Sequence, residues 1–300
     1  MTPEELHVRV PWGEIRGLVW GPEDGHPVLC LHGLADNCGS FSTLIPLLPP
    51  DFRYVAMDFP GHGRSSHRPP GTFYNLTAYV ADVRRVVQAL RWSHFTLMGH
   101  SMGGNVAGTF SALYPEMVEN LVLLESFGFL PSEAAQVPAR LRQVLDGMLQ
   151  LESTEKKPKV YSYEGAAERL SVANPSLTPE SVRVLLRRGL VDVDRGFQFS
   201  RDFALSLGNV RISVEHMLQL QMKIRAAVLI VTADEGFKKQ YPDSERDQVA
   251  ARLLQVYRAQ QATLVSVPGD HHCHLNRPEG VAAVLSPFLL QKTGRSSAKL

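Results

Sequence analysis

Gly99-His100-Ser101-Met102-Gly103-Gly104 places a serine between glycines, and this stretch decides the fold. Residues 94–98 before it predict a short buried strand, and the small-residue run 105–114 after it predicts a helix that Pro115 ends. Glycine lacks the side chain that would clash in such a sharp turn from strand to helix. The pattern G-x-S-x-G in this setting therefore predicts an exposed serine at the tip of a strand.

The composition is that of an ordinary globular protein. The chain has 300 residues, of which 44% are hydrophobic and 20% are charged, enough for one large core with a smaller insertion. Its 31 basic residues balance its 30 acidic ones, so the charge predicts neither a nucleic-acid partner nor attraction to an anionic membrane. The longest apolar runs are strand-sized, which predicts no stable membrane insertion.

The three cysteines, Cys30, Cys38 and Cys273, are an odd number without the spacing of a metal site. We expect them to be free thiols in a reducing compartment. The first six residues are acidic and lack an apolar signal region, so we expect a protein that is not secreted.

The last nine residues, 292–300, are polar, and we expect them to form a flexible tail. The tail ends in Ala298-Lys299-Leu300, which resembles the Ser-Lys-Leu peroxisomal address in having a small residue, a cation and a leucine. This resemblance predicts a peroxisomal import receptor as a partner and peroxisomal localisation. The alternative is an ordinary frayed terminus on a cytoplasmic protein.

Short apolar runs alternate with helical patterns along most of the chain. Residues 6–20 predict an antiparallel hairpin around Pro11-Trp12-Gly13, and apolar residues at helical spacing predict a helix over 76–90. Further strands are predicted at 28–31, 54–57, 121–124, 228–232 and 262–267. This alternation predicts an α/β fold, a mostly parallel sheet flanked by helices.

One segment interrupts the alternation. From about 130 to 216 it has no convincing strand but has three helical patterns, at 139–151, 163–170 and 179–188. We therefore expect a helical cap over 128–216, inserted into a core made of residues 1–127 and 217–291.

Polar residues directly follow four of the predicted strands: His32, Asp58, Ser101 and Glu125. The carboxyl ends of parallel strands meet at one edge of a sheet, and ligands bind beyond that edge. We expect these four residues to share one rim.

Four landmarks, in this order, resemble those of the capped α/β-hydrolase superfamily, and the resemblance covers residues 6–291. They are Leu31-His-Gly-Leu34, the segment from Asp58 to Ser65, the turn at Ser101, and the segment from Gly269 to Glu279. Residues 31–48 are more narrowly similar to the animal serine hydrolase-like proteins. The superfamily implies an α/β fold with a helical cap, whereas the narrower group implies little about substrate.

The resemblance implies that Ser101 is a nucleophile. Serine attacks poorly at neutral pH unless a base within hydrogen-bond reach takes its proton. Superfamily members often carry that base in the pattern His-x-x-x-Leu-x-x-Pro-Glu, and here His271 fits it. His272 and His274 are then interpreted as loop or lid-facing residues. Three close histidines without a further ligand are a weak indication of a metal site.

The acid that orients the histidine has three candidates. Many relatives carry it after the seventh strand in the pattern Gly-x-x-Asp. When this chain is aligned with that pattern, Gly236 falls at the position of the acid, and Asp234 and Glu235 lie one or two residues before it. Other branches carry the acid at the end of the sixth strand, where this chain has Glu125. We favour Glu125 and keep Glu235 and Asp234 as alternatives.

The resemblance also implies an oxyanion hole, made of the backbone N–H groups of Leu34 and Met102. His32 and His100 are interpreted as structural and rim residues rather than bases. Asp58 and the glycine-rich turn that follows it are interpreted as scaffold, because small residues permit a tight loop beside the rim.

The primary hypothesis is a serine hydrolase that cleaves an ester or thioester of a mainly apolar acyl group through an acyl-enzyme on Ser101, without a cofactor. Apolar residues in 197–199 and 217–220 motivate the apolar acyl group. Serine at this position argues against the aspartate chemistry of dehalogenases and epoxide hydrolases, whereas hydroxynitrile lyase and carbon–carbon hydrolase chemistry stay open. The alternative is a ligand-binding protein of the same fold with little or no turnover, because losing the orienting acid costs about 10⁴ in kcat.

Overall fold

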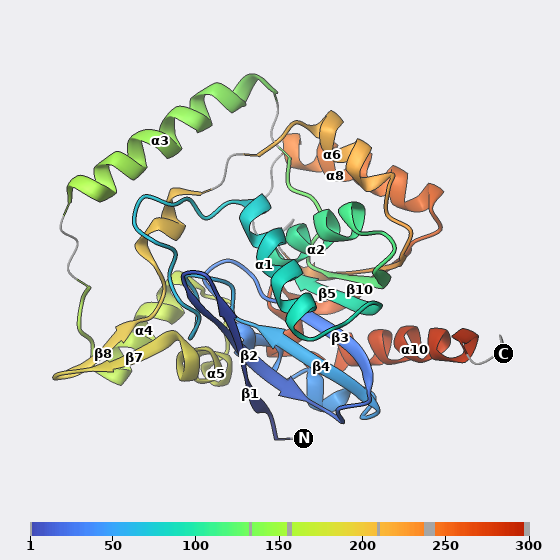
Figure 1. The fold of residues 1–300 in the computed structure, drawn as a ribbon, viewed down its shortest axis with the longest axis horizontal. Coiled ribbons are helices and arrows are strands. Elements are labelled where there is room, and N and C mark those ends of the chain that lie inside the picture. Colours follow the sequence, from blue (N-terminus) through green and yellow to red (C-terminus); the bar gives the residue numbers. More distant parts are fainter. Residues whose placement is uncertain (1, 132–133, 155–157, 209–210, 237–243, 297–300) are drawn as a thin grey trace.

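An eight-stranded sheet forms the centre of the molecule (Figure 1). The computed structural model describes residues 2–131, 134–154, 158–208, 211–236 and 244–296. In their spatial order, the strands are β1 (Glu4–Val10), β2 (Gly13–Trp20), β4 (Phe52–Met57), β3 (His26–Leu31), β5 (Phe95–His100), β6 (Val118–Leu124), β9 (Ala227–Glu235) and β10 (Thr263–Asp270).

The sheet is parallel apart from its first two strands. β1 and β2 form the expected hairpin, and β2 pairs antiparallel with β4. The remaining strand pairs are parallel. The inner parallel strands have helices on both faces and are largely buried, which explains their continuous apolar runs. Their carboxyl ends meet along one edge, so residues that follow different strands come close together.

Helices cover both faces of the sheet, which confirms the predicted fold class. They include α1 (Leu76–Ala89), α2 (Met102–Leu113), α8 (Ser244–Ala259) and α10 (Pro278–Ser296). α1, α2 and α8 bury apolar side chains against one face, and α10 does so against the other. Shorter helical segments are η1 (Cys38–Phe41), η2 (Ile45–Leu47), η3 (Ala134–Gln136), η4 (Phe203–Leu207) and α9 (Cys273–Asn276). Within the described ranges, no helix is both long and apolar enough to cross a membrane.

The segment between β6 and β9 is the one for which a helical cap is predicted, and it is mostly helical. Its longer helices are α3 (Val137–Ser153), α4 (Tyr163–Ala173), α5 (Pro179–Gly189) and α6 (Val214–Gln221). The expectation that this segment has no strand is wrong, because β7 (Leu190–Val193) and β8 (Gly196–Phe199) form a small antiparallel sheet. Each strand has only four residues, too few for an alternating pattern to stand out, and a two-residue turn sets their register.

The expectation of a flexible tail over 292–300 is also wrong in part. α10 continues to Ser296, because an existing helix gains a backbone hydrogen bond with each further residue. Ala298, Lys299 and Leu300 lie outside the described residues, so the peroxisomal address stays a prediction.

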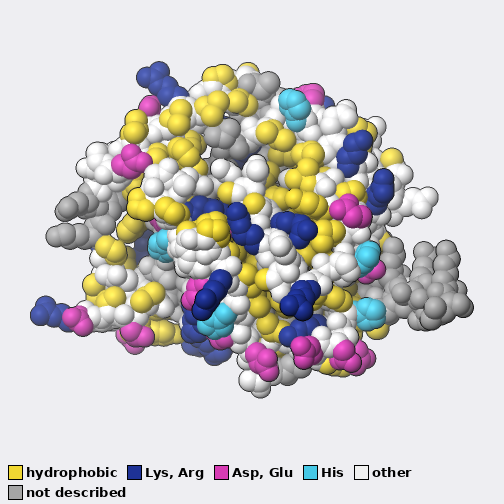
Figure 2. Space-filling view, in the orientation of Figure 1, with side chains coloured by type: hydrophobic (Ala, Val, Ile, Leu, Met, Phe, Trp, Pro, Cys, Tyr) yellow, Lys and Arg dark blue, Asp and Glu magenta, His cyan; other side chains and the backbone are white. Residues whose placement is uncertain are grey.

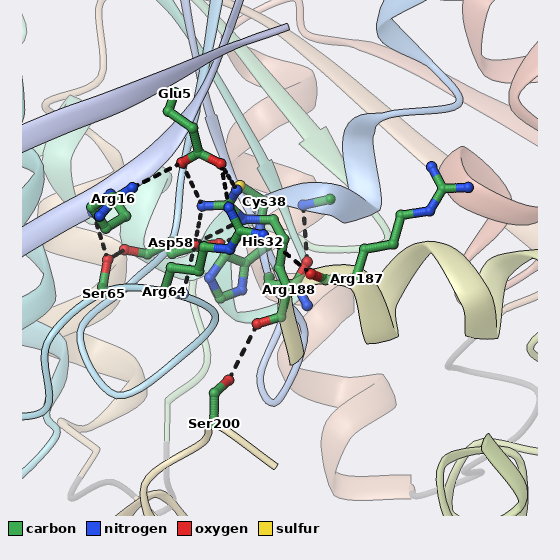
Figure 3. A network of polar contacts seen from close by, with 12 residues as sticks. Glu5, Arg16, His32, Cys38, Asp58, Arg64, Ser65, Arg187, Arg188 and Ser200 are labelled. Atoms are coloured by element: carbon green, nitrogen blue, oxygen red, sulfur yellow. Dashed lines mark hydrogen bonds and ion pairs between the residues drawn. The ribbon is translucent and has the colours of Figure 1, made fainter. Parts of the chain in front are cut away.

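A buried ion pair ties the cap to the core (Figure 3). Arg188 of α5 lies 2.8 Å from the carboxylate of Asp58, and both side chains are almost fully buried. Asp58 also accepts hydrogen bonds from the backbone N–H groups of Cys38 and Arg64, and Glu5 of β1 lies 2.6 Å from Arg188. Burial acts to raise the pKa of Asp58, but Arg188, His32 and the Arg64 N–H together outweigh it and hold that pKa below its ordinary value.

We expect Arg188→Met to lower the free energy of unfolding by about 3–5 kcal/mol, because it leaves the buried charge of Asp58 without its partner. Urea unfolding at neutral pH, followed by circular dichroism, measures the loss. Arg183→Met is the matched control on the same helix. Its pair with Glu180 is exposed, so we expect a change under about 1 kcal/mol. Equal losses in the two variants would contradict the role given to Arg188.

Candidate active site

Ser101 occupies a strained turn between β5 and α2. Its backbone has φ 52° and ψ −115°, a conformation that is rare for a residue with a side chain. A side chain at Gly99 would collide with the backbone of Gly103, and one at Gly103 would collide with the carbonyl of Leu31. The two flanking glycines therefore let helix and strands approach closely enough to hold the serine at the carboxyl edge of the sheet.

His271, which follows β10, contacts the serine and one of the candidate acids. Its Nε2 lies 3.0 Å from Ser101 Oγ, and its Nδ1 lies 3.1 Å from Glu125 Oε2. A carboxylate at Nδ1 favours the tautomer that carries its proton there, which leaves Nε2 to accept the serine proton. The side chain of Glu125 is only 4% exposed. These contacts are the ones that a serine nucleophile, its base and an orienting acid would need.

The other two candidate acids lie elsewhere at the end of β9. Asp234 accepts a hydrogen bond from the backbone N–H of Gly269 at 2.8 Å, and Glu235 is largely exposed. Glu125 instead reaches across from the end of the neighbouring strand, β6, and its Oε1 accepts from the Ala233 N–H at 2.6 Å. Of the three candidates, Glu125 is therefore the one that the structure brings against His271.

Gly236 explains why the acid comes from β6. A side chain built on Gly236 would overlap the carboxyl group of Glu125, so the two positions compete for the same space. This is the position at which many relatives carry their acid. Here the absence of a side chain leaves room for a glutamate from the adjacent strand.

The histidines near His271 form a buried cluster with Asp36. His272 Nε2 lies 3.4 Å from Asp36 Oδ2. Burial acts to lower the pKa of His272, but the carboxylates of Asp36, Asp270 and Glu125 together outweigh it and raise that pKa above its ordinary value.

Burial lowers the pKa of His274 to about 3 and lowers that of His100 as well. His272 lies in the turn before α9 and lines the cavity, which agrees with its interpretation as a loop or lid-facing residue. That interpretation is wrong for His274, which lies within α9 and is fully buried. No group of metal-ligating side chains in the described ranges is arranged to hold an ion.

His32, Asp58, Ser101 and Glu125 each directly follow a strand of the sheet, as expected, but His32 and Asp58 take no part in the contacts with His271. His32 is fully buried, and its ring accepts from the Phe59 N–H at 3.0 Å while donating to the Gly33 carbonyl at 2.7 Å. Asp58 is equally buried in its pair with the cap. Both residues support the loops that follow their strands, because their polar atoms are satisfied by neighbouring backbone and side chains.

Sequence reasoning missed Asn276, which joins the histidine loop to the cap. Its amide nitrogen lies 2.8 Å from the Asp270 carboxylate and 2.9 Å from the Ser176 carbonyl. Its amide oxygen accepts from the hydroxyl of Ser181 at 2.6 Å. Asp270 immediately precedes His271, so the side chain of Asn276 holds the loop that carries His271. The only sequence signal for this role is that Asn276 is a polar residue within the segment 269–279, and this does not reveal which residues it binds.

Ser101 faces a cavity of about 770 Å³, a size typical of small-molecule sites. Leu34 and Met102 line it beside the serine. Within the described residues, the Leu34 N–H donates to no backbone acceptor. The Met102 N–H belongs to the first residue of α2 and has no acceptor within its own helix. Both N–H groups are therefore available to stabilise a developing oxyanion.

Comparisons with known proteins agree with the fold and with the sequence motifs. The α/β hydrolase fold family matches residues 26–155. A serine hydrolase-like protein of Danio rerio is 52% identical over a match that covers 95% of this chain and 88% of the relative. The chain belongs to the serine hydrolase-like proteins.

Solved structures extend this similarity. A hypothetical protein of Pseudomonas aeruginosa PAO1 is 33% identical, with a TM-score of 0.85 over 96% of this chain and 99% of that one. A thioesterase domain from the curacin biosynthetic pathway is 26% identical, with a TM-score of 0.79 over 95% of this chain and 99% of that one. These similarities support hydrolase function for this serine hydrolase-like protein.

In this serine hydrolase-like protein, we expect Glu125→Ala to lower kcat for ester hydrolysis by about 10²–10⁴, because the base loses its orienting carboxylate. Adding Gly236→Asp to that variant should raise kcat again by at least about tenfold, since an aspartate at this position enters the space that Glu125 vacates. Stopped assays with a p-nitrophenyl ester measure both values.

Two controls separate this exchange from general damage. Gly236→Asp alone should destabilise the protein, because its Cβ would come within 2.4 Å of the carboxylate oxygens of the buried Glu125. Asp234→Ala should lower kcat by less than about tenfold, because that side chain holds Gly269 rather than the base. A double variant no faster than Glu125→Ala, although well folded, would contradict the shared position.

Proposed function

We propose that this protein hydrolyses an ester or thioester of a mainly apolar acyl group through an acyl-enzyme on Ser101. The observation that carries the proposal is the pair of hydrogen bonds made by His271. Its Nε2 lies 3.0 Å from Ser101 Oγ, and its Nδ1 lies 3.1 Å from Glu125 Oε2. These are the distances at which a serine, a base and an acid act as one unit.

The proposed reaction begins when His271 Nε2 takes the proton of Ser101 and the serine oxygen attacks the acyl carbon. Glu125 stabilises the imidazolium that forms, and backbone N–H groups stabilise the negative charge on the acyl oxygen. The imidazolium then gives its proton to the leaving oxygen or sulfur. A water molecule, deprotonated by the same imidazole, releases the acid and restores the serine.

The lining of the cavity supports an apolar acyl group. One wall is made of side chains from α1, α2 and α6, namely Leu76, Tyr79, Val106 and Met217. Leu34 and Leu130 add apolar surface that is partly exposed, at 53% and 37%. Polar residues, Asp36, Asn105 and Arg211 among them, also line the cavity, so the apolar surface supports a substrate that carries a hydrocarbon part beside its polar groups. The thioesterase domain among the similar structures makes a thioester a natural alternative to an oxygen ester.

A series of p-nitrophenyl esters from acetate to decanoate tests the proposal. We expect kcat/KM to rise with chain length over the first several carbons, by up to about fourfold for each buried methylene, because each contributes ~0.8 kcal/mol. Leu130→Gln, which changes the wall without touching the contacts around the serine, should reduce the rate for octanoate more than for acetate. Ser101→Ala should abolish hydrolysis of every ester. Hydrolysis that survives this change, or no preference beyond acetate, would contradict the proposal.

A further inference from the structure

α3 lies along the edge of the cap with one side turned to solvent (Figure 1). Leu141, Leu145 and Leu149 are four residues apart, which aligns them in one ridge along this helix, here called the leucine ridge. Their exposed fractions are 38%, 52% and 64%. Hydrophobic side chains gather along the same edge in the space-filling view (Figure 2). A contiguous apolar ridge on the surface is a candidate contact for another molecule.

The side of α3 that faces the molecule is already packed. Val144 and Met148 are 7% and 5% exposed, and they lie about 60–100° around the helix from Leu145. On the same helix, a methyl group at Gly147 would come within 2.9 Å of Leu207 of η4. The leucine ridge is therefore not needed to attach α3 to its own chain.

Charges of both signs flank the leucine ridge on one side. Arg142 and Asp146 lie 3.5 Å apart, and their side chains are 86% and 67% exposed. At 3.6 residues per turn, they are about 60° and 100° around the helix from Leu145. The cation precedes the anion, which is the less favourable order for a pair within one helix. A partner helix that places an anion opposite Arg142 and a cation opposite Asp146 would complement these two charges.

We propose that the leucine ridge packs against the same ridge of a second copy of this chain, with the two helices antiparallel. A two-fold axis at Leu145 sets this residue against its own copy and sets Leu141 against the partner's Leu149. With a rise of 1.5 Å per residue, Arg142 then lies about 3 Å along the axis from the partner's Asp146. The symmetry repeats this opposite-charge contact, because the antiparallel two-fold axis places the charged flanks of both helices on the same side of the interface.

The size of the contact sets its strength. α3 has 17 residues and is thus about 25 Å long, and one pair of such helices is small for a protein interface. We expect a dimer that dissociates on dilution, with a Kd on the order of micromolar. The contact covers the ridge in both copies, so assembly stops at two. This inference does not depend on the proposed reaction.

Engineered cysteines test the antiparallel register. Under mild oxidation, Leu145→Cys should form an intermolecular disulfide, because the two-fold axis brings the residue close to its copy. Leu141→Cys alone should not, since its copy lies about 12 Å away along the helix axis. Leu141→Cys combined with Leu149→Cys should crosslink again. The native cysteines are buried and free, so they give little background on a non-reducing gel.

Sedimentation velocity at about 50 μM tests association without crosslinking. Wild type should sediment largely as a dimer, and Leu145→Asp as a monomer. Arg142→Asp and Asp146→Arg should each weaken association by at least about tenfold, and the two together should restore it. A folded wild type that stays monomeric, or crosslinking of Leu141→Cys as fast as of Leu145→Cys, would overturn the proposal. So would a monomer whose binding to phosphatidylcholine vesicles is lost in Leu145→Asp, because that result assigns the ridge to a lipid surface.

Discussion

The close approach of α2 to β3 is the constraint on which the site depends. The backbone of Gly103 lies so near the Leu31 carbonyl that no side chain fits between them. This contact sets the start of α2, and with it Ser101, beside the loop that follows β3 and carries Leu34. Backbone packing therefore positions the serine and the nearby N–H groups before any substrate arrives. Such preorganisation is what makes an oxyanion hole effective, because no reorganisation is needed during the reaction.

The acid shows how neighbouring strands can substitute for one another. β6 and β9 are adjacent and parallel, so their carboxyl ends lead to the same point beside His271. Glu125 reaches it from β6, with a backbone φ of 50° that turns the chain toward the base. Gly236 leaves that point open from β9. A displaced acid in the sequence therefore does not indicate a disabled site, since the carboxylate can arrive from the other strand.

Local patterns predicted much of the fold and part of the candidate site. The strand, turn and helix around Ser101 follow from apolar runs and glycines, and the spacing after His271 distinguished it from the histidines beside it. The acid stayed open because it depends on which strands are neighbours. Arg188 and Asn276 were missed for the same reason. Arg188 pairs with Asp58, and Asn276 binds the backbone of Ser176. Both partners lie far along the chain, so no local spacing in the sequence encodes these contacts. The small sheet of the cap was missed because its strands are too short to show a period.

The most direct test of the account is fluorophosphonate labelling of the purified protein, with the modified residue located by mass spectrometry. A fluorophosphonate reacts with a serine whose proton a nearby base can take. The account predicts labelling at Ser101 in wild type, and loss of that labelling in Ser101→Ala and in His271→Ala. A well-folded wild type that is not labelled would contradict it and would favour a ligand-binding protein built on the same fold.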